Sequence, residues 1–246
     1  MEESLRQQYL EAMGIQNWVG REAAPEPDVV QVPVETPQPD LQPEPVVETK
    51  APKIVAKNNI AGLDWIELRS RVESCKACEL HKTRTQTVFG VGNQNADLLI
   101  IGEAPGADED RQGEPFVGKA GQLLNAMLKA IGFSREQVFI ANILKCRPPG
   151  NRDPHQDEAL NCEPFLQRQI ELIQPKVILA VGRVAAHNLL KTDVAVGKLR
   201  GREDFIGDAK IPVVVTYHPA YLLRSPDQKG KAWQDLQVVY RKIHNT

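Results

Sequence analysis

From about position 63 onward, the apolar residues form short uninterrupted runs, and the longer segments between them have apolar positions at helical spacing. The runs have the length of buried strands, and the segments between them repeat apolar positions every three or four residues. The runs lie at residues 97–102, 138–144, 176–182 and 213–217. The helical segments lie at residues 120–133, 157–174, 183–191 and 229–244. Alternating strands and helices predict a three-layer α/β/α fold with a central, mostly parallel sheet of four strands.

The first 60 residues have a different character. Residues 1–21 predict a short amphipathic helix, because Leu5, Tyr9 and Met13 recur at helical spacing. Eight of the 18 prolines fall between positions 22 and 52, among residues that cannot bury enough apolar area to offset ordering. The predicted organisation is therefore a helical peptide at 1–21, a proline-rich disordered linker at 22–60 and a folded domain at 61–246.

Composition narrows the class of protein. Hydrophobic residues make up 41% of the 246, which is enough for a core, yet no apolar run approaches the roughly 20 residues of a membrane helix. The acidic start of the chain lacks the layout of a secretion signal. We therefore expect a cytoplasmic protein that makes no use of a membrane. Residues 1–60 carry a net charge of −5 and the remainder +3, which is compatible with nucleic acid but weak evidence for it.

Polar side chains follow the predicted strands. Glu103 comes directly after the first strand, Asn142 lies near the end of the second, Arg183 follows the third and His218 follows the fourth. Ligands of parallel sheets bind outside the carboxyl ends of the strands. A carboxylate, an amide and an imidazole that converge there predict an active site.

The four cysteines are Cys75, Cys78, Cys146 and Cys162. The first two form a Cys-x-x-Cys pair, and we expect all four to build one thiolate site rather than disulfides. Thiolates suit zinc or an iron–sulfur cluster, and their spacing leaves both open. Scattered buried cysteines are the remaining alternative.

Six segments together resemble the family 4 uracil-DNA glycosylases, the iron–sulfur class of their superfamily, and the resemblance spans about residues 65–243. They are ESCKACELHKTRTQTVFGVGN, IIGEAPGADEDRQGEPFVGKAGQLL, ANILKCRPPGNRDP, NCEPFL, ILAVGRVAA and TYHPAYLLR. The resemblance implies a monofunctional glycosylase that hydrolyses the N-glycosidic bond of uracil in single- or double-stranded DNA and so begins base excision repair. It also implies that the four cysteines hold a structural [4Fe-4S] cluster. The alternative is a silent relative that serves as a polymerase-associated binding module, which we would expect to lack Glu103, Asn142 or His218.

The resemblance assigns catalysis to Glu103 and His218. Glu103 is expected to position the attacking water and oppose the cationic sugar. His218 is expected to donate a hydrogen bond to uracil O2 and to stabilise the departing anion. Glu109 and Asp110 are interpreted as solvated or as supporting the site.

Further residues are assigned to substrate binding. Phe116 matches the residue that stacks on the flipped base. Asn142 is expected to read uracil O4 and N3–H, because an amide both donates and accepts. The backbone of Gly102 and Ala104 is expected to approach the base closely.

Contacts with the DNA are expected around the last strand. Leu222 or Leu223 is predicted to fill the space left by the flipped base, and Arg224 to contact a phosphate. Other basic side chains are weaker candidates for phosphate contacts. They are Lys119, Lys145, Arg147, Arg152 and Arg183.

The N-terminal segment LEAMGIQNWVGR resembles the peptide with which the psi subunit of bacterial DNA polymerase III binds the clamp loader. The matching residues are Leu10, Met13, Gly14, Ile15, Trp18 and Arg21. We hypothesise that residues 1–21 tether a nucleoid-associated, monomeric enzyme to the replication machinery.

Overall fold

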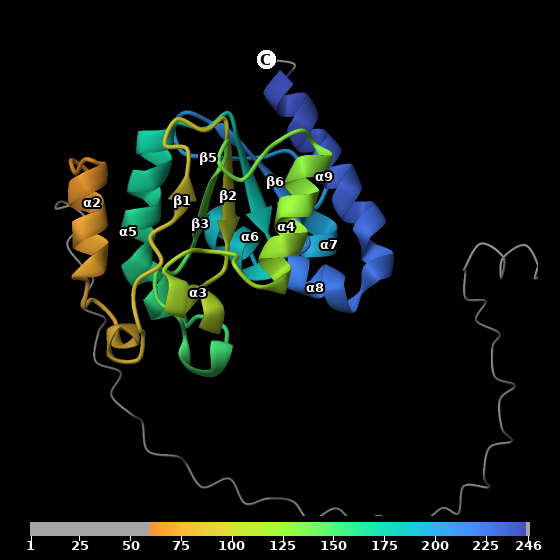
Figure 1. Ribbon diagram of the computed structural model, residues 1–246. Coiled ribbons are helices and arrows are strands. Elements are labelled where there is room, and N and C mark those ends of the chain that lie inside the picture. Colours follow the sequence, from red (N-terminus) through yellow and green to blue (C-terminus); the bar gives the residue numbers. More distant parts are fainter. Residues whose placement is uncertain (1–59, 245–246) are drawn as a thin grey trace, which may run out of the picture. The chain divides into compact units, whose positions relative to one another are not determined.

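A computed structural model describes residues 60–244 of the protein (Figure 1). The predicted peptide 1–21 and the linker up to residue 59 lie outside the described residues. The described part begins at Ile60, whose side chain packs in the core one residue before the predicted start of the domain.

The sheet has six strands in the order β1-β3-β2-β4-β6-β5. The strands are β1 (Val91–Gly92), β2 (Leu98–Gly102), β3 (Phe139–Asn142), β4 (Val177–Val181), β5 (Asp204–Ile206) and β6 (Ile211–Thr216). Strands β3, β2, β4 and β6 run parallel, whereas β1 and β5 pair antiparallel at the two edges. The parallel centre therefore has the four strands predicted from the apolar runs, and the edge strands extend it.

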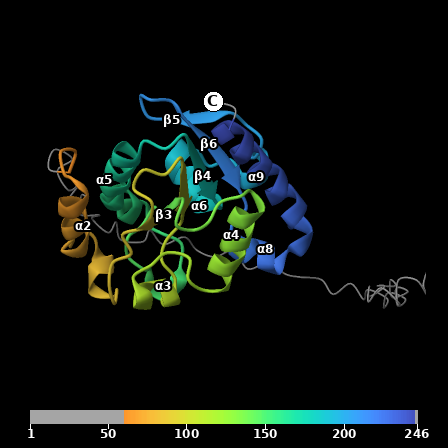
Figure 2. The same ribbon diagram turned by 45° about the horizontal axis from the view of Figure 1, so that its top comes forward.

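Helices cover both faces of this sheet, as Figures 1 and 2 show. The helices of the described part are α2 (Trp65–Glu73), α3 (Ala107–Gln112), α4 (Lys119–Ala130), α5 (Gln156–Ile173), α6 (Arg183–Leu190), α7 (Val196–Leu199), α8 (Pro219–Arg224) and α9 (Lys229–His244), and the short α3 lies beyond the ends of the strands rather than over a face. Short 3₁₀ turns occupy Glu79–Lys82, Pro149–Asn151 and Pro226–Gln228. The four longer helical segments predicted from the sequence correspond to α4, α5, α6 and α9.

The core has two halves because successive side chains of a strand point to opposite faces. Leu99 and Ile101 of β2 pack with α2, α5 and α6, whereas Leu98 and Ile100 pack with α4, α8 and α9. A strand that is buried on both faces must be apolar throughout, which explains the uninterrupted runs in the sequence. Within the described residues, no helix combines the length and the apolar character needed to cross a bilayer.

Candidate active site

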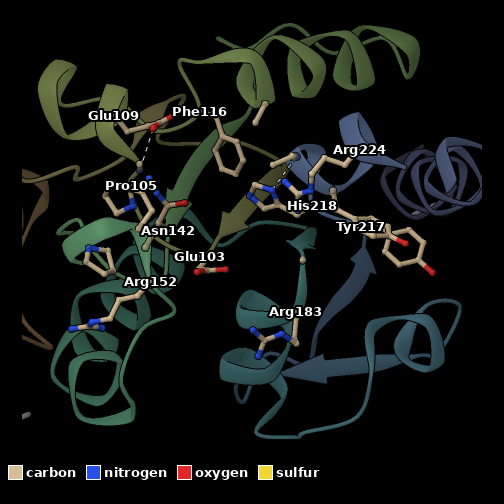
Figure 3. Close-up of a pocket in the computed structure, with 18 of the residues that line it drawn as sticks. Glu103, Pro105, Glu109, Phe116, Asn142, Arg152, Arg183, Tyr217, His218 and Arg224 are labelled. Atoms are coloured by element: carbon tan, nitrogen blue, oxygen red, sulfur yellow. Dashed lines mark hydrogen bonds between the residues drawn. The ribbon is translucent and has the colours of Figure 1, made fainter. Parts of the chain in front are cut away.

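A cavity of about 700 Å³ opens at the carboxyl ends of the parallel strands, and Figure 3 shows the side chains around it. Glu103, Phe116, Asn142 and His218 all line it, although they come from separate parts of the chain. Ala104 lines it as well. The structure thus brings together Glu103, Asn142 and His218, which the strand ends predicted, and Phe116, which the resemblance assigned.

Glu103 directly follows β2, and its backbone carbonyl accepts a hydrogen bond from the N–H of Leu144 at 3.0 Å. This bond joins the Glu103 loop to the residues that follow β3. Burial raises the pKa of the Glu103 carboxyl, the neighbouring carboxylate of Asp153 adds to the rise, and Arg183 opposes it. A carboxylate in this position is poorly solvated, and it therefore interacts strongly with any positive charge that develops in the cavity.

His218 is the residue before α8, and its ring orientation is fixed by that helix. Its Nδ1 accepts a hydrogen bond from the N–H of Ala220 at 3.1 Å, so the proton of the neutral ring lies on Nε2. Burial lowers the pKa of His218 to about 4, and Arg224 contributes further. At neutral pH the imidazole is therefore an uncharged donor.

Phe116 has an unusual backbone conformation, with φ at +54°, which costs free energy for a residue with a side chain. Arg135 holds this turn by donating hydrogen bonds to the carbonyls of Pro115 and of Phe116, the latter at 3.3 Å. Gly121 of α4 packs so closely that a Cβ there would lie 1.8 Å from the Phe116 carbonyl oxygen. The ring of Phe116 stacks beside that of His218, with 5.6 Å between their centroids.

Asn142 is the last residue of β3 and is only 3% exposed, yet its Oδ1 is buried without a hydrogen-bond partner. Buried polar atoms are nearly always paired, so this acceptor is available to a ligand. Its backbone carbonyl accepts a hydrogen bond from the buried Nζ of Lys145 at 2.9 Å. Gly102 does not itself line the cavity, but it lies against both Asn142 and Phe116.

Glu109 supports the loops of the site rather than being merely solvated. One carboxylate oxygen accepts from the N–H of Gly106 and the other from the N–H of Val117, both at 3.1 Å (Figure 3 draws the first). The carboxylate therefore ties the loop after β2 to the turn that carries Phe116. Asp110 is also structural, because it accepts two hydrogen bonds from the N–H of Thr85.

Two of the predicted DNA contacts need correction. Lys145 is buried and bonded to Asn142 and Gln169, so it cannot reach a phosphate. Leu222 is 1% exposed because it lies on the face of α8 that packs into the core, which leaves Leu223, at 44%, as the exposed member of the pair.

Arg152 and Arg183 do line the rim of the cavity, each beside a carboxylate partner. Arg183 lies 2.5 Å from Asp153, a pair that is more than half exposed. Arg152 makes two hydrogen bonds with Glu158, which is nearly buried. Exposed pairs contribute little to stability, so Arg183 is the easier of the two to redirect towards a ligand.

The four cysteines line a second, smaller cavity. Arg84 donates to Cys146 Sγ at 3.0 Å, and the backbone N–H of Lys145 donates to Cys162 Sγ at 3.3 Å. Burial raises the pKa of Cys78 to about 11 and that of Cys162 to about 12. Among residues 60–244, no group of three or more His, Cys, Asp or Glu side chains is placed to hold a metal ion.

The sheet is covered by helices on both faces, and one pocket at its edge holds an acid, an amide, an aromatic ring and a neutral imidazole. This combination is typical of an enzyme active site. Residues 89–237 match the model of the uracil DNA glycosylase superfamily. The chain belongs to this superfamily.

Several proteins with known names are similar to this chain in sequence. A type-4 uracil-DNA glycosylase of Archaeoglobus fulgidus is 45% identical over 174 residues, which cover 68% of this chain and 87% of the relative. The type-4 enzyme of Thermotoga maritima is 46% identical over 157 residues, or 63% and 81% of the two chains. More distantly, a DNA polymerase of Bacillus phage SP01 is 30% identical over 152 residues, which are 61% of this chain and 16% of the polymerase.

Proposed function

We propose that the protein is a uracil-DNA glycosylase that hydrolyses the N-glycosidic bond of uracil in DNA and so begins base excision repair. The observation that carries the proposal is the unpaired, buried Oδ1 of Asn142 in a pocket that also contains Phe116, Glu103 and His218. The type-4 relatives, which the chain matches over most of their length, support the same activity.

Asn142 supplies the selectivity for the base. Its Oδ1 accepts the N3–H of uracil, and its Nδ2 donates to O4. Cytosine presents an acceptor at N3 and an amino donor at C4. The Asn142 Oδ1 acceptor would then face an acceptor and the Nδ2 donor would face a donor, so neither hydrogen bond could form. The base lies against the ring of Phe116, which binds any base through its aromatic face.

His218 and Glu103 act on the two charges that form when the bond breaks. The Nε2–H of neutral His218 donates to O2 of uracil, where negative charge develops as the pair of bonding electrons moves to N1. The buried carboxylate of Glu103 opposes the positive charge on the sugar and positions a water for attack at C1′. Water oxygen bonds to C1′, the C1′–N1 bond breaks, and the water's proton neutralises the uracil anion.

The proposal is tested with uracil-containing oligonucleotides, single- and double-stranded, followed by alkaline cleavage at abasic sites. We expect cleavage at uracil by the wild-type protein, none on the matching thymine oligonucleotide, and a large loss with Glu103→Gln. An intact uracil strand after incubation with folded wild-type protein would overturn the proposal and favour the silent binding module.

We propose further that the four cysteines hold a [4Fe-4S] cluster. Such a cluster is held by four Cys thiolates, and the four thiols here line one cavity. The donors at Cys146 and Cys162 stabilise thiolates, and a bound metal supplies the charge that ionises thiols with raised pKa values. When bound, the cluster braces the loops that carry the cysteines and takes no part in the hydrolysis.

Anaerobic purification tests this assignment. We expect a brown protein with about four irons and four sulfides per chain, the composition of one such cluster. Each Cys→Ser variant should lose the colour. A colourless protein that contains zinc would contradict the cluster.

The association of residues 1–21 with the clamp loader also remains a proposal, as does a location on the chromosome. The support for the clamp-loader association is the Leu-x-x-Met-Gly-Ile-x-x-Trp pattern of the N-terminal peptide. A pull-down with Trp18→Ala should recover less clamp loader than wild type. Equal recovery would rule out this peptide as the anchor.

A further inference from the structure

Two tyrosines lie beside the proposed base pocket without a part in the chemistry. Tyr217 and Tyr221 line the same cavity as His218, and their ring centroids are 5.2 Å apart (Figure 3 labels Tyr217). The backbone N–H of Tyr221 donates to the carbonyl of His218 at 2.9 Å, which places Tyr221 one helical turn after the imidazole. Tyr221 is 38% exposed, so much of its side chain is open to solvent.

Tyr217 is held in place from behind. The guanidinium of Arg200 lies over its ring, 5.1 Å from the centroid. Arg200 makes hydrogen bonds of 2.7 and 2.9 Å to the two oxygens of the buried Asp235, which also accepts from Thr216 at 2.8 Å. Tyr217 is thus a fixed wall, and Tyr221 lies against it with its remaining surface towards solvent.

We propose that Tyr221, supported by Tyr217, is a second base-binding subsite, which stacks the nucleobase next to the uracil in the same strand. The inference rests on the proposed function, because it takes the base that lies against Phe116 and accepts from His218 to be uracil. Aromatic faces stack on any base, which suits a neighbour whose identity varies. Arg224 lines the same cavity three residues further along α8, on the same helical face, and can contact the adjoining phosphate.

The subsite predicts a preference for DNA strands. A base that stacks on Tyr221 must leave its own neighbours, which costs less in a single strand than in a duplex. The subsite therefore favours single-stranded or locally opened DNA around the uracil. If Tyr221 were instead a wedge that fills the space left by the flipped base, its loss would weaken activity on duplex DNA and not on a single strand. A wedge acts only where a base stack surrounds the flipped base.

The test compares Tyr221→Leu and Tyr221→Phe with Tyr240→Leu as the matched control. Tyr240 is a 46% exposed tyrosine of α9 that does not line the cavity. On a single-stranded uracil oligonucleotide, Tyr221→Leu should raise KM about 5- to 150-fold, the effect of losing one stacked base. The kcat of Tyr221→Leu should stay within about twofold of wild type, because the lost stacking contact stabilises the bound substrate and the transition state equally. Tyr221→Phe and Tyr240→Leu should match wild type.

A second substrate isolates the stacked base. An oligonucleotide with tetrahydrofuran abasic analogues, which alkali does not cleave, on both sides of the uracil should raise the wild-type KM by a similar factor. It should leave Tyr221→Leu no worse than it is on the normal strand, because the two changes remove the same contact. The subsite would be overturned if the two changes raised KM additively, or if the effect of Tyr221→Leu were confined to duplex DNA. It would also be overturned if Tyr221→Leu had the KM and the melting temperature of wild type.

Failure of the proposed function gives a different result. If folded wild-type protein leaves uracil in place, the glycosylase proposal is overturned. The subsite is then decided by fluorescence anisotropy with a labelled single strand that contains no uracil. Weaker binding by Tyr221→Leu than by Tyr240→Leu would support it, and equal binding would overturn it.

Discussion

Replacing Gly102 by alanine tests the close packing that positions the proposed base-reading residues. Gly102 ends β2 and pairs with Asn142 in the neighbouring strand. A Cβ at this position would lie 2.5 Å from Asn142 Oδ1 and 2.6 Å from Phe116 Cζ. A carbon normally approaches other carbons to about 3.5–4.0 Å, so the ring of Phe116 must move by roughly 1 Å.

This displacement sets the size of the expected effect. A misplacement of about 1 Å in a catalytic site costs on the order of 100-fold in rate, or about 2.7 kcal/mol of transition-state stabilisation. Forcing one extra methyl group into a filled interior also costs about 1–3 kcal/mol of folding stability. In a domain of this size each kcal/mol lowers the melting temperature by about 2–4 °C.

Single-turnover excision on a uracil oligonucleotide measures the first effect, and thermal unfolding measures the second. Gly230→Ala is the control, because a Cβ at Gly230 meets no atom within 4 Å and alanine favours its helix. We expect this control to match wild type in rate and to be slightly more stable. A Gly102→Ala rate within about threefold of wild type would refute the proposed role of this packing in placing Asn142 and Phe116.

Three further substitutions address charge and backbone support. His218→Gln should slow excision about 10²–10³-fold by weakening one donor to the leaving anion. Burial lowers the pKa of His218 to about 4, so the contribution of this residue to stability is lost as pH falls from 6.5 towards 4. The urea midpoint of His218→Gln should therefore vary less with pH over that range than the wild-type midpoint. An unchanged pH dependence would contradict the burial of a neutral ring. Glu103→Gln should lose excision yet raise the urea midpoint at pH 8. A carboxyl with a raised pKa favours folding at low pH and loses that contribution as pH rises through its folded-state pKa. A lower midpoint at pH 8 would contradict the raised pKa of Glu103. Arg135→Met should raise KM and lower the melting temperature by freeing the left-handed turn at Phe116, and an unaltered KM would show that Arg135 has no positioning role.

The sequence could predict the central sheet because buried parallel strands leave an unmistakable pattern of apolar runs. It could also predict that Glu103, Asn142 and His218 meet, because the direction of parallel strands places their carboxyl ends at one edge. The edge strands β1 and β5 were not predicted, since two or three residues are too few to show a period. Helices α2, α3, α7 and α8 were not predicted either, and three of these are short.

Residues that act through distant partners left no signal of their own. Arg135 is an ordinary surface-type residue in the sequence, and only the fold brings it to the carbonyl of Phe116, 19 positions earlier. The burial of Lys145 was likewise unpredictable, since its neighbours in the chain are those of a strand end. Leu222 and Leu223 are identical in type, and only the orientation of α8 separates the buried one from the exposed one.

The stretch from Asn142 to Cys146 explains how a thiol site outside the pocket can affect recognition of the base. The buried Nζ of Lys145 joins the Asn142 carbonyl to Oε1 of Gln169 in α5, while the backbone N–H of Lys145 contacts Cys162 Sγ in the same helix. The end of β3 is therefore held against α5 in two ways: through the hydrogen bonds of the Lys145 side chain, and through the backbone contact of Lys145 with the Cys162 thiol. Because Asn142 must place both amide atoms within hydrogen-bond distance of a ligand, small shifts of α5 relative to β3 act directly on the proposed base-reading group. A structural cluster at the four cysteines would fix this relation without touching the substrate.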